Sequence, residues 1–184
     1  STEEYSGLSS FVDPQVELSS TSTTNSVPDF FMGDQSNIQA SVYGRIRNVN
    51  DVIQGISGSS LSEEQKNELL GQVYFFRAWC YYNLFKWYGG VPLVKETQDP
   101  VESSVTPRAT SKETYEFILD DLNMAADMLA AKTENGSGWS EKGRVTSGTA
   151  LALKGRLMLL WCSPLFNRAN DENRWKTAYE TMKS

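Results

Sequence analysis

Two stretches of the chain place aromatic rings beside acidic or amide groups at positions where no helix is expected. In the first, Phe30 and Phe31 lie between Asp29 and Asp34, and in the second Trp139 follows an Asn-Gly turn. Sugar-binding sites set an apolar ring against the C–H face of a pyranose and use carboxylates or amides for the hydroxyls. We therefore predict that these five residues bind an oligosaccharide. The alternative is that the rings pack under neighbouring helices as a lid.

The sequence offers little for catalysis. It contains no histidine, which excludes the Ser-His-Asp triad, the Cys-His pair and zinc sites built on histidine. Asp120 and Asp121 are adjacent in a helical pattern, so their side chains point to different faces and do not suggest an acid–base pair. Arg77 lies among aromatic residues, and we expect a structural carboxylate or a ring to hold it. We predict a protein that is not an enzyme and that has no cofactor.

Two other groups of residues have structural explanations. The Asn and Asp residues between 167 and 173 supply oxygens that suit calcium, but the spacing and glycine of an EF-hand loop are absent. Helix capping and turn formation explain them better, so no metal site is predicted. Cys80 and Cys162 lie within apolar helical patterns, which favours buried free thiols. A disulfide between their helices stays open, because it depends on a Cα distance that the sequence does not give.

Composition narrows the class of partner. The net charge is −6 and no run of Lys or Arg is present, which argues against nucleic acid and against direct adhesion to an anionic membrane. The longest apolar run, residues 157–162, is far shorter than the roughly 18 residues that a membrane span requires. Neutral ligands such as sugars, or a protein partner, remain open.

Apolar periodicity and helix-end signals predict an all-α fold. Residues 1–36 are expected to be mostly loop and residues 37–184 helical, within a single domain that covers 1–184. Capping boxes at Ser62 with Gln65 and at Thr110 with Glu113 mark two helix starts. The other expected elements are a helix at 37–56, a helix at 146–161, and a last helix that Asp171 caps.

The helix that ends at Tyr88 is apolar on most of its circumference. Positions 69, 73, 76, 80, 84 and 87 form the predicted core face, and Tyr74, Tyr81, Tyr82 and Phe85 form a second flank. Pro92 requires an extended segment at 91–94. The residues that we predict to be almost fully buried are Phe76, Cys80, Leu84, Leu119, Leu122, Leu153 and Leu157.

Four motifs, in this order along the chain, resemble the SusD/RagB family of surface glycan-binding lipoproteins. Residues 43–53 are similar to the family's preceding helix, residues 108–129 to its R-x-[ST]-x-x-E-x-Y pattern, and residues 143–161 to its G-R-[VA]-[ST] helix. The most specific match is the aromatic helix with its Gly-Gly turn and V-P-L-V. Its matching residues are Phe76, Arg77, Ala78, Tyr81, Tyr82, Leu84, Tyr88, Gly89, Gly90, Val91, Pro92, Leu93 and Val94.

The resemblance implies a function and a place in the cell. Family members are held at the outer-membrane surface by a lipid anchor. They bind oligosaccharides there and deliver them to a TonB-dependent, SusC-like transporter without changing them chemically. They are several times longer than this chain, which we interpret as an amino-terminal helical fragment. The matched motifs are scaffold motifs, so they transfer no ligand-binding role to Asp29, Phe30, Phe31, Asp34 or Trp139.

A second functional class is compatible with the same pattern. Paired antiparallel helices, with starts near 111 and 145, suggest tetratricopeptide-like stacking with a repeat of about 34 residues. Such scaffolds present concave surfaces to peptides and protein partners. A helical-repeat protein–protein interaction scaffold with no sugar role is therefore the alternative to glycan binding.

Overall fold

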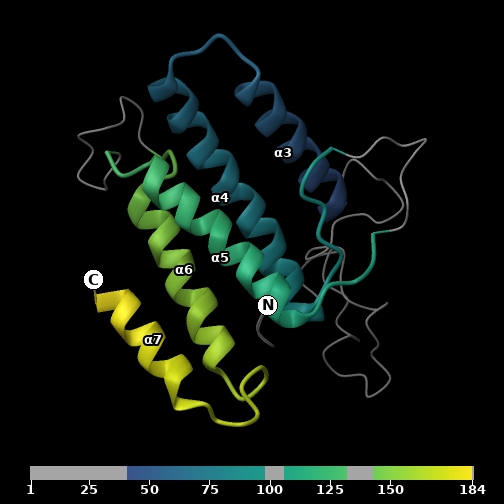
Figure 1. Ribbon diagram of the computed structural model, residues 1–184, viewed down its shortest axis with the longest axis vertical. Helices are drawn as coiled ribbons and strands as arrows, with labels where there is room; N and C mark the ends of the chain where they lie inside the picture. The colour runs from purple at the N-terminus through teal and green to yellow at the C-terminus, as the bar shows by residue number, and fades with distance from the viewer. Residues whose placement is uncertain (1–40, 98–105, 132–142, 184) are drawn as a thin grey trace, which may run out of the picture.

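The computed structural model describes residues 41–97, 106–131 and 143–183, and these residues form five α-helices. The helices are α3 (Val42–Ser57), α4 (Glu63–Tyr88), α5 (Ser111–Met128), α6 (Ser147–Cys162) and α7 (Glu172–Lys183). Each helix packs mainly against the next one in the chain and runs antiparallel to it, so the helices form a sequential, tetratricopeptide-like stack (Figure 1). The prediction of an all-α fold is confirmed.

The helix starts follow the local signals of the sequence. The Ser62 and Thr110 hydroxyls accept hydrogen bonds from the backbone N–H groups of Gln65 and Glu113, and both capping boxes are complete. Thr146 caps α6 in the same way. Helix α3 begins later than the predicted residue 37, because Ser41 is its N-cap and its side chain accepts from the Gly44 N–H.

The segment after α4 is extended, as Pro92 predicts. It forms an isolated antiparallel bridge between Pro92 and Arg108, with the Ala109 N–H donating to the Val91 carbonyl at 3.2 Å. Arg108 secures the same crossing by donating from Nε to the Gly90 carbonyl at 2.6 Å. This short contact ties the connection between α4 and α5 back onto the end of α4.

The core lies between α3, α4, α5 and α6. Its largest fully buried side chains include Ile46, Tyr81, Leu84, Phe85, Ile118, Leu122, Leu129 and Leu157. Gly71 lets α5 approach α4, since a Cβ at that position would lie 2.6 Å from Leu129 Cγ. At Gly155 an added Cβ would meet the end of the Met182 side chain, so this glycine leaves room for that side chain where α7 packs on α6.

The predicted core face of α4 is wrong in part. Leu84 is buried, but Phe76 is 50% exposed and Trp87 45% exposed, and Cys80 is only partly buried. The buried face instead runs through Phe75, Ala78, Tyr81, Tyr82 and Phe85. The error has a physical cause: α4 carries apolar residues nearly all round, so its periodicity does not select one face. Elsewhere Leu122, Leu153 and Leu157 are buried as predicted, whereas Leu119 is only partly buried.

Candidate functional site

The five residues predicted to bind sugar lie outside the described residues. Asp29, Phe30, Phe31 and Asp34 fall within 1–40, and Trp139 falls within 132–142. Their role therefore stays a prediction. The described part of the chain offers two other polar arrangements, a buried arginine network on α4 and an open cavity beside α6 and α7.

The first arrangement centres on Arg77, which is only 6% exposed. Its Nε and Nη2 donate to the two carboxylate oxygens of Asp121 at 2.8 and 2.7 Å, and Asp121 is 1% exposed. The guanidinium also lies 5.2 Å from the Tyr74 ring centroid and 5.1 Å from that of Phe117. The expectation that a carboxylate or a ring holds Arg77 is confirmed, and both do so.

The same network fixes the extended segment after α4. Arg77 Nη1 donates to the Lys95 carbonyl at 3.1 Å and to Asn50 Oδ1 at 3.0 Å. Asn50 in turn donates to the Val94 carbonyl at 3.0 Å, and the Tyr81 hydroxyl accepts from the Val94 N–H at 2.8 Å. Residues 91–97 are therefore held by side chains from α3 and α4 along most of their length.

Burial shapes the ionisation of this network. Burial by itself lowers the pKa of Arg77, but the hydrogen bonds and charge of Asp121 raise it. The net effect is a raised pKa, so the guanidinium stays charged. Burial raises the pKa of the Tyr43 hydroxyl to about 12. It also raises the pKa of the Tyr81 hydroxyl. Asp121 uses both oxygens on Arg77, and Asp120 is exposed, so the two carboxylates do not act as an acid–base pair.

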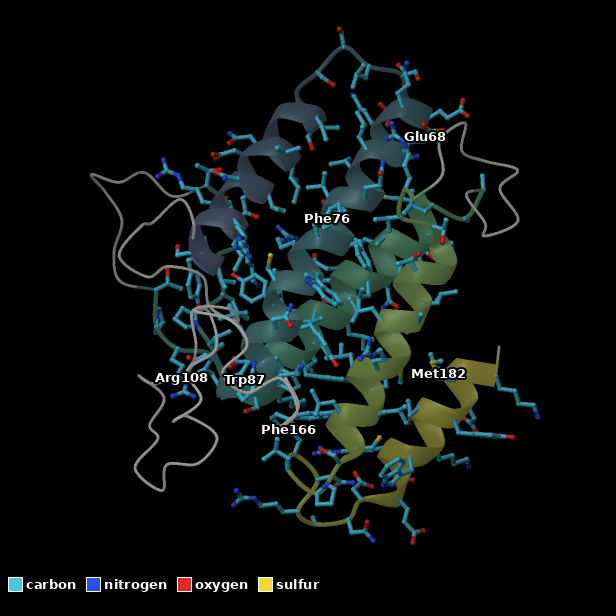
Figure 2. The ribbon with its side chains drawn as sticks, turned by 180° about the vertical axis from the view of Figure 1, so that it is seen from behind. Glu68, Phe76, Trp87, Arg108, Phe166 and Met182 are labelled. Atoms are coloured by element: carbon cyan, nitrogen blue, oxygen red, sulfur yellow. The ribbon has the colours of Figure 1, made fainter. Side chains whose placement is uncertain are left out.

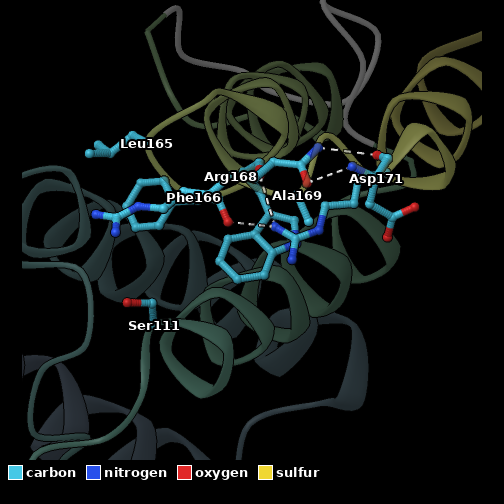
Figure 3. A pocket seen from close by; sticks show the side chains of 9 residues that line it. Ser111, Leu165, Phe166, Arg168, Ala169 and Asp171 are labelled. Atoms are coloured by element: carbon cyan, nitrogen blue, oxygen red, sulfur yellow. Dashed lines mark hydrogen bonds between the residues drawn. The ribbon is translucent and has the colours of Figure 1, made fainter.

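The second arrangement is an open cavity of about 450 Å³ where the start of α5 meets the α6–α7 connection. Ser111 lies on one side of it and residues 165–169 on the other (Figure 3). A neighbouring cavity of about 400 Å³ extends along α5 and α7. The two cavities share three lining residues, Trp161, Asp171 and Arg174. They therefore meet around Arg174.

Trp161 and Arg174 form the wall of this cavity. The Arg174 guanidinium lies 4.2 Å from the Trp161 ring centroid, and the Tyr115 ring stacks on the same indole at 4.6 Å. Arg174 Nη1 donates to the Phe166 carbonyl at 3.0 Å and to the Trp161 carbonyl at 3.3 Å. Arg174 and Tyr115 already pack on the indole of Trp161. The polar edge of the Arg174 guanidinium is therefore more available to a ligand than the Trp161 ring is.

The turn before α7 accounts for the Asn and Asp cluster. Asn167 donates to the Asp171 carbonyl at 3.1 Å, and its own Oδ1 accepts from the Asp171 N–H at 2.9 Å. Asp171 Oδ1 accepts from the Asn173 N–H at 3.0 Å and caps α7. The prediction of caps and turns is confirmed. Among the described residues, no group of three or more His, Cys, Asp or Glu side chains is arranged to hold a metal.

Sequence reasoning missed Arg174 and Trp161. They are 13 residues apart, and although Trp161 ends the matched stretch 143–161, Arg174 lies outside every matched motif. Only the packing of α7 on α6 brings them together, so no local signal predicts the contact. Both cysteines are free, with Cys162 buried and Cys80 partly buried.

Exposed aromatic side chains line the outer side of α4. Phe76, which is labelled in Figure 2, is 50% exposed, and Trp79 is 42% exposed. Trp79 stacks on the buried Phe75 with ring centroids 6.5 Å apart. About half of the surface of each of these two side chains, Phe76 and Trp79, is therefore exposed to solvent.

The fold and the buried Arg77 network define a helical-repeat scaffold whose loops are fixed by polar side chains. Comparison with known proteins identifies the family. Residues 6–159 match the SusD-like family described as "Starch-binding associating with outer membrane". The chain belongs to this SusD-like family, and the resemblance that the sequence motifs indicate is confirmed.

Individual relatives agree with the family assignment. A SusD-like protein of Bacteroides ovatus is 28% identical over 120 residues, which cover 64% of this chain and 21% of the relative. A solved SusD-like protein of Bacteroides fragilis is 33% identical with a TM-score of 0.61, covering 79% of this chain and 27% of that one.

Two further similar structures are associated with particular glycans. A laminarin-binding SusD-like protein is 25% identical with a TM-score of 0.59, covering 73% of this chain and 28% of that one. A structure with xylogluco-oligosaccharide is 25% identical with a TM-score of 0.66, covering 86% of this chain and 32% of that one. The chain thus spans between a fifth and a third of the relatives named here. No helix among the described residues is long and apolar enough to cross a membrane.

Proposed function

We propose that this protein binds oligosaccharides at the cell surface and passes them to a TonB-dependent, SusC-like transporter without chemical change. The observation that carries the proposal is the family match over residues 6–159. The two relatives named for laminarin and xylogluco-oligosaccharide support a glycan ligand. They differ in the glycan, so they leave its identity open. Attachment to the outer membrane as a lipoprotein is part of the same proposal, as is the absence of catalysis.

The helices serve as a scaffold in this proposal. The polar atoms of the network already have partners within the protein. Arg77 donates to Asp121 and Asn50, whereas Asn50 and Tyr81 form hydrogen bonds with the segment 91–97. A side chain whose polar atoms are already paired gains little from a ligand. The network therefore orients a connection between helices and leaves recognition to other residues. We propose Asp29, Phe30, Phe31 and Asp34 as the first candidates for recognition and Trp139 as the next.

One observation favours the alternative, a protein–protein interaction scaffold with no sugar role. The outer side of α4 exposes Phe76 and Trp79, and α7 exposes Trp175, Tyr179 and Met182. Exposed aromatic and Met side chains at helical spacing are common where another protein packs. Such a surface is also compatible with docking of the transporter, so it does not by itself separate the two functions.

Calorimetry with laminarin and xyloglucan oligosaccharides tests the proposal. We compare the wild type with Phe30→Ala, Phe31→Ala and Trp139→Ala. If these residues bind sugar, we expect weak binding of the wild type, with a dissociation constant on the order of millimolar. The three variants should then bind more weakly. Unchanged affinity in all three variants would place the site elsewhere, and no heat with any oligosaccharide would favour the protein-interaction alternative.

A further inference from the structure

The cavity beside α6 and α7 contains an arginine with an unusual set of partners. Arg174 is half-buried, and among the described residues its guanidinium donates to two carbonyl groups and lies over the Trp161 ring. The ion pairs in the described part of the chain involve Lys66, Arg77 and Lys112, and none involves Arg174. The guanidinium therefore has a fixed position without a carboxylate partner among the described residues.

The contacts of Arg174 also fix its orientation. Both carbonyl groups accept from Nη1, and the plane of the guanidinium lies over the indole. The donors on Nε and Nη2 make no hydrogen bond to a described residue. A guanidinium held in this way presents two parallel N–H groups, a geometry that matches a carboxylate. Because the side chain is already ordered, a ligand that uses this pair does not have to immobilise it.

The surroundings of Arg174 favour a negative charge in the larger cavity. Arg168 lines the same cavity, and Ser111 lies at the amino-terminal end of α5, where the helix dipole is positive. Asp171 is the one acidic lining residue, and one of its oxygens already caps α7. The formal charge of the lining is thus positive, with two arginines against one aspartate, in a chain whose net charge is −6.

The shape and the remaining wall suit a sugar. A volume of about 450 Å³ falls in the range of small-molecule sites, and Leu165 and Phe166 supply an apolar side. Given the proposed function, on which this inference rests, we propose that the cavity binds the carboxylate of a uronic acid residue of a glycan. Arg174 binds the carboxylate through its paired donors, and Arg168 adds a second positive charge to the lining. Ser111 forms a hydrogen bond with a sugar hydroxyl, and the apolar side contacts the sugar ring. The glycan class is therefore acidic.

Matched pairs of ligands give a direct test. We titrate the protein with digalacturonate and with a glucuronate-containing disaccharide, and we repeat each titration with the methyl ester of the same sugar. The ester keeps the size and the hydroxyls but lacks the negative charge. We expect the acids to bind roughly 10-fold more tightly than their esters, because hydrogen bonds to charged groups are the stronger kind. The difference should shrink as salt is raised, since screening weakens an exposed charge pair.

Substitutions locate the binding to the cavity. Arg168→Gln should reduce the preference for the acid over its ester, because it removes one of the two positive charges that line the cavity. Arg174→Lys, which keeps the charge but loses the paired donors, should also reduce the preference. Arg156→Gln is the matched control, because Arg156 is an exposed α6 arginine that lines neither cavity. Circular dichroism of each variant checks that the helices are retained.

Each contrary result has a distinct meaning. Equal affinity for acid and ester, or an equal effect of Arg168→Gln and Arg156→Gln, would overturn the uronate site. Acetate that displaces the uronate at equal concentration would also overturn it, because the cavity would then select carboxylates without the sugar. If neutral oligosaccharides bind and uronates do not, glycan binding stands and this inference fails. If neither class binds, the proposed function fails as well.

Discussion

Two arginines of this protein lie on aromatic rings, but they differ in what else they contact. Arg77 stacks on Tyr74 and Phe117 and forms a two-bond ion pair with the buried Asp121. Arg174 stacks on Trp161 and donates only to carbonyl groups. The first arginine thus contributes to the core of the scaffold, whereas the second lines an open cavity. The charged partner of an arginine, rather than its aromatic setting, therefore distinguishes a structural arginine from one that is open to a ligand.

The largest expected effect follows from removing Arg77. Arg77→Ala leaves the Asp121 carboxylate buried without its partner, and breaking a buried ion pair in this way typically costs about 3–5 kcal/mol of unfolding free energy. Urea denaturation measures the loss. The double variant Arg77→Ala/Asp121→Ala should lose less than the sum of the two single variants. Additive losses would show that Arg77 and Asp121 are not coupled, which would contradict the structural role of Arg77.

The next largest effect is a difference in stability loss between substitutions on the buried and the exposed face of α4. Leu84 is 1% exposed and Phe76 is 50% exposed, so Leu84→Ala should lower the unfolding free energy by about 2–5 kcal/mol and Phe76→Ala by about 1 kcal/mol. Thermal and urea unfolding of both variants checks the order. A larger loss for Phe76→Ala would show that the outer side of α4 is covered in the intact protein.

Arg174 should matter less for stability than Arg77. Arg174→Ala removes one cation–π contact and two hydrogen bonds at a half-buried position, where water can replace the donor. We expect a loss of about 1 kcal/mol, measured by urea denaturation. A loss as large as that of Arg77→Ala would mean that Arg174 is structural, and the contrast between the two arginines would disappear.

The last expected effect is a dependence of stability on alkaline pH. The pKa of Tyr43 is about 12 in the folded protein, above the ordinary tyrosine value near 10, because the hydroxyl is buried. The unfolded chain therefore loses its proton first, and stability that is complete below about pH 10 should fall as the pH rises towards 12. Urea denaturation between pH 9 and pH 12 follows this loss. Tyr43→Phe should reduce the slope, and an unchanged slope would assign it to other groups.

Local chemistry predicted most of the helix boundaries. Ser62 with Gln65 and Thr110 with Glu113 satisfy the first N–H groups of their helices whatever packs around them, so α4 and α5 begin where the sequence indicates. Pro92 forces an extended segment in the same local way. The partner of Arg77 was predictable in kind, because a guanidinium among aromatic rings needs a carboxylate or a ring, although its identity as Asp121, 44 residues away, was not.

Tertiary packing decided what the sequence left ambiguous. The sequence of α4 is apolar nearly all round, so it permits several buried faces, and the close approach of α5 at Gly71 selects the one with Ala78 and Tyr81. The cavity is likewise a product of packing, because Trp161 belongs to α6 and Arg174 to α7. Caps and turns depend on neighbours in the chain and can be read from it. Faces and cavities depend on contacts between distant residues, which only the folded chain supplies.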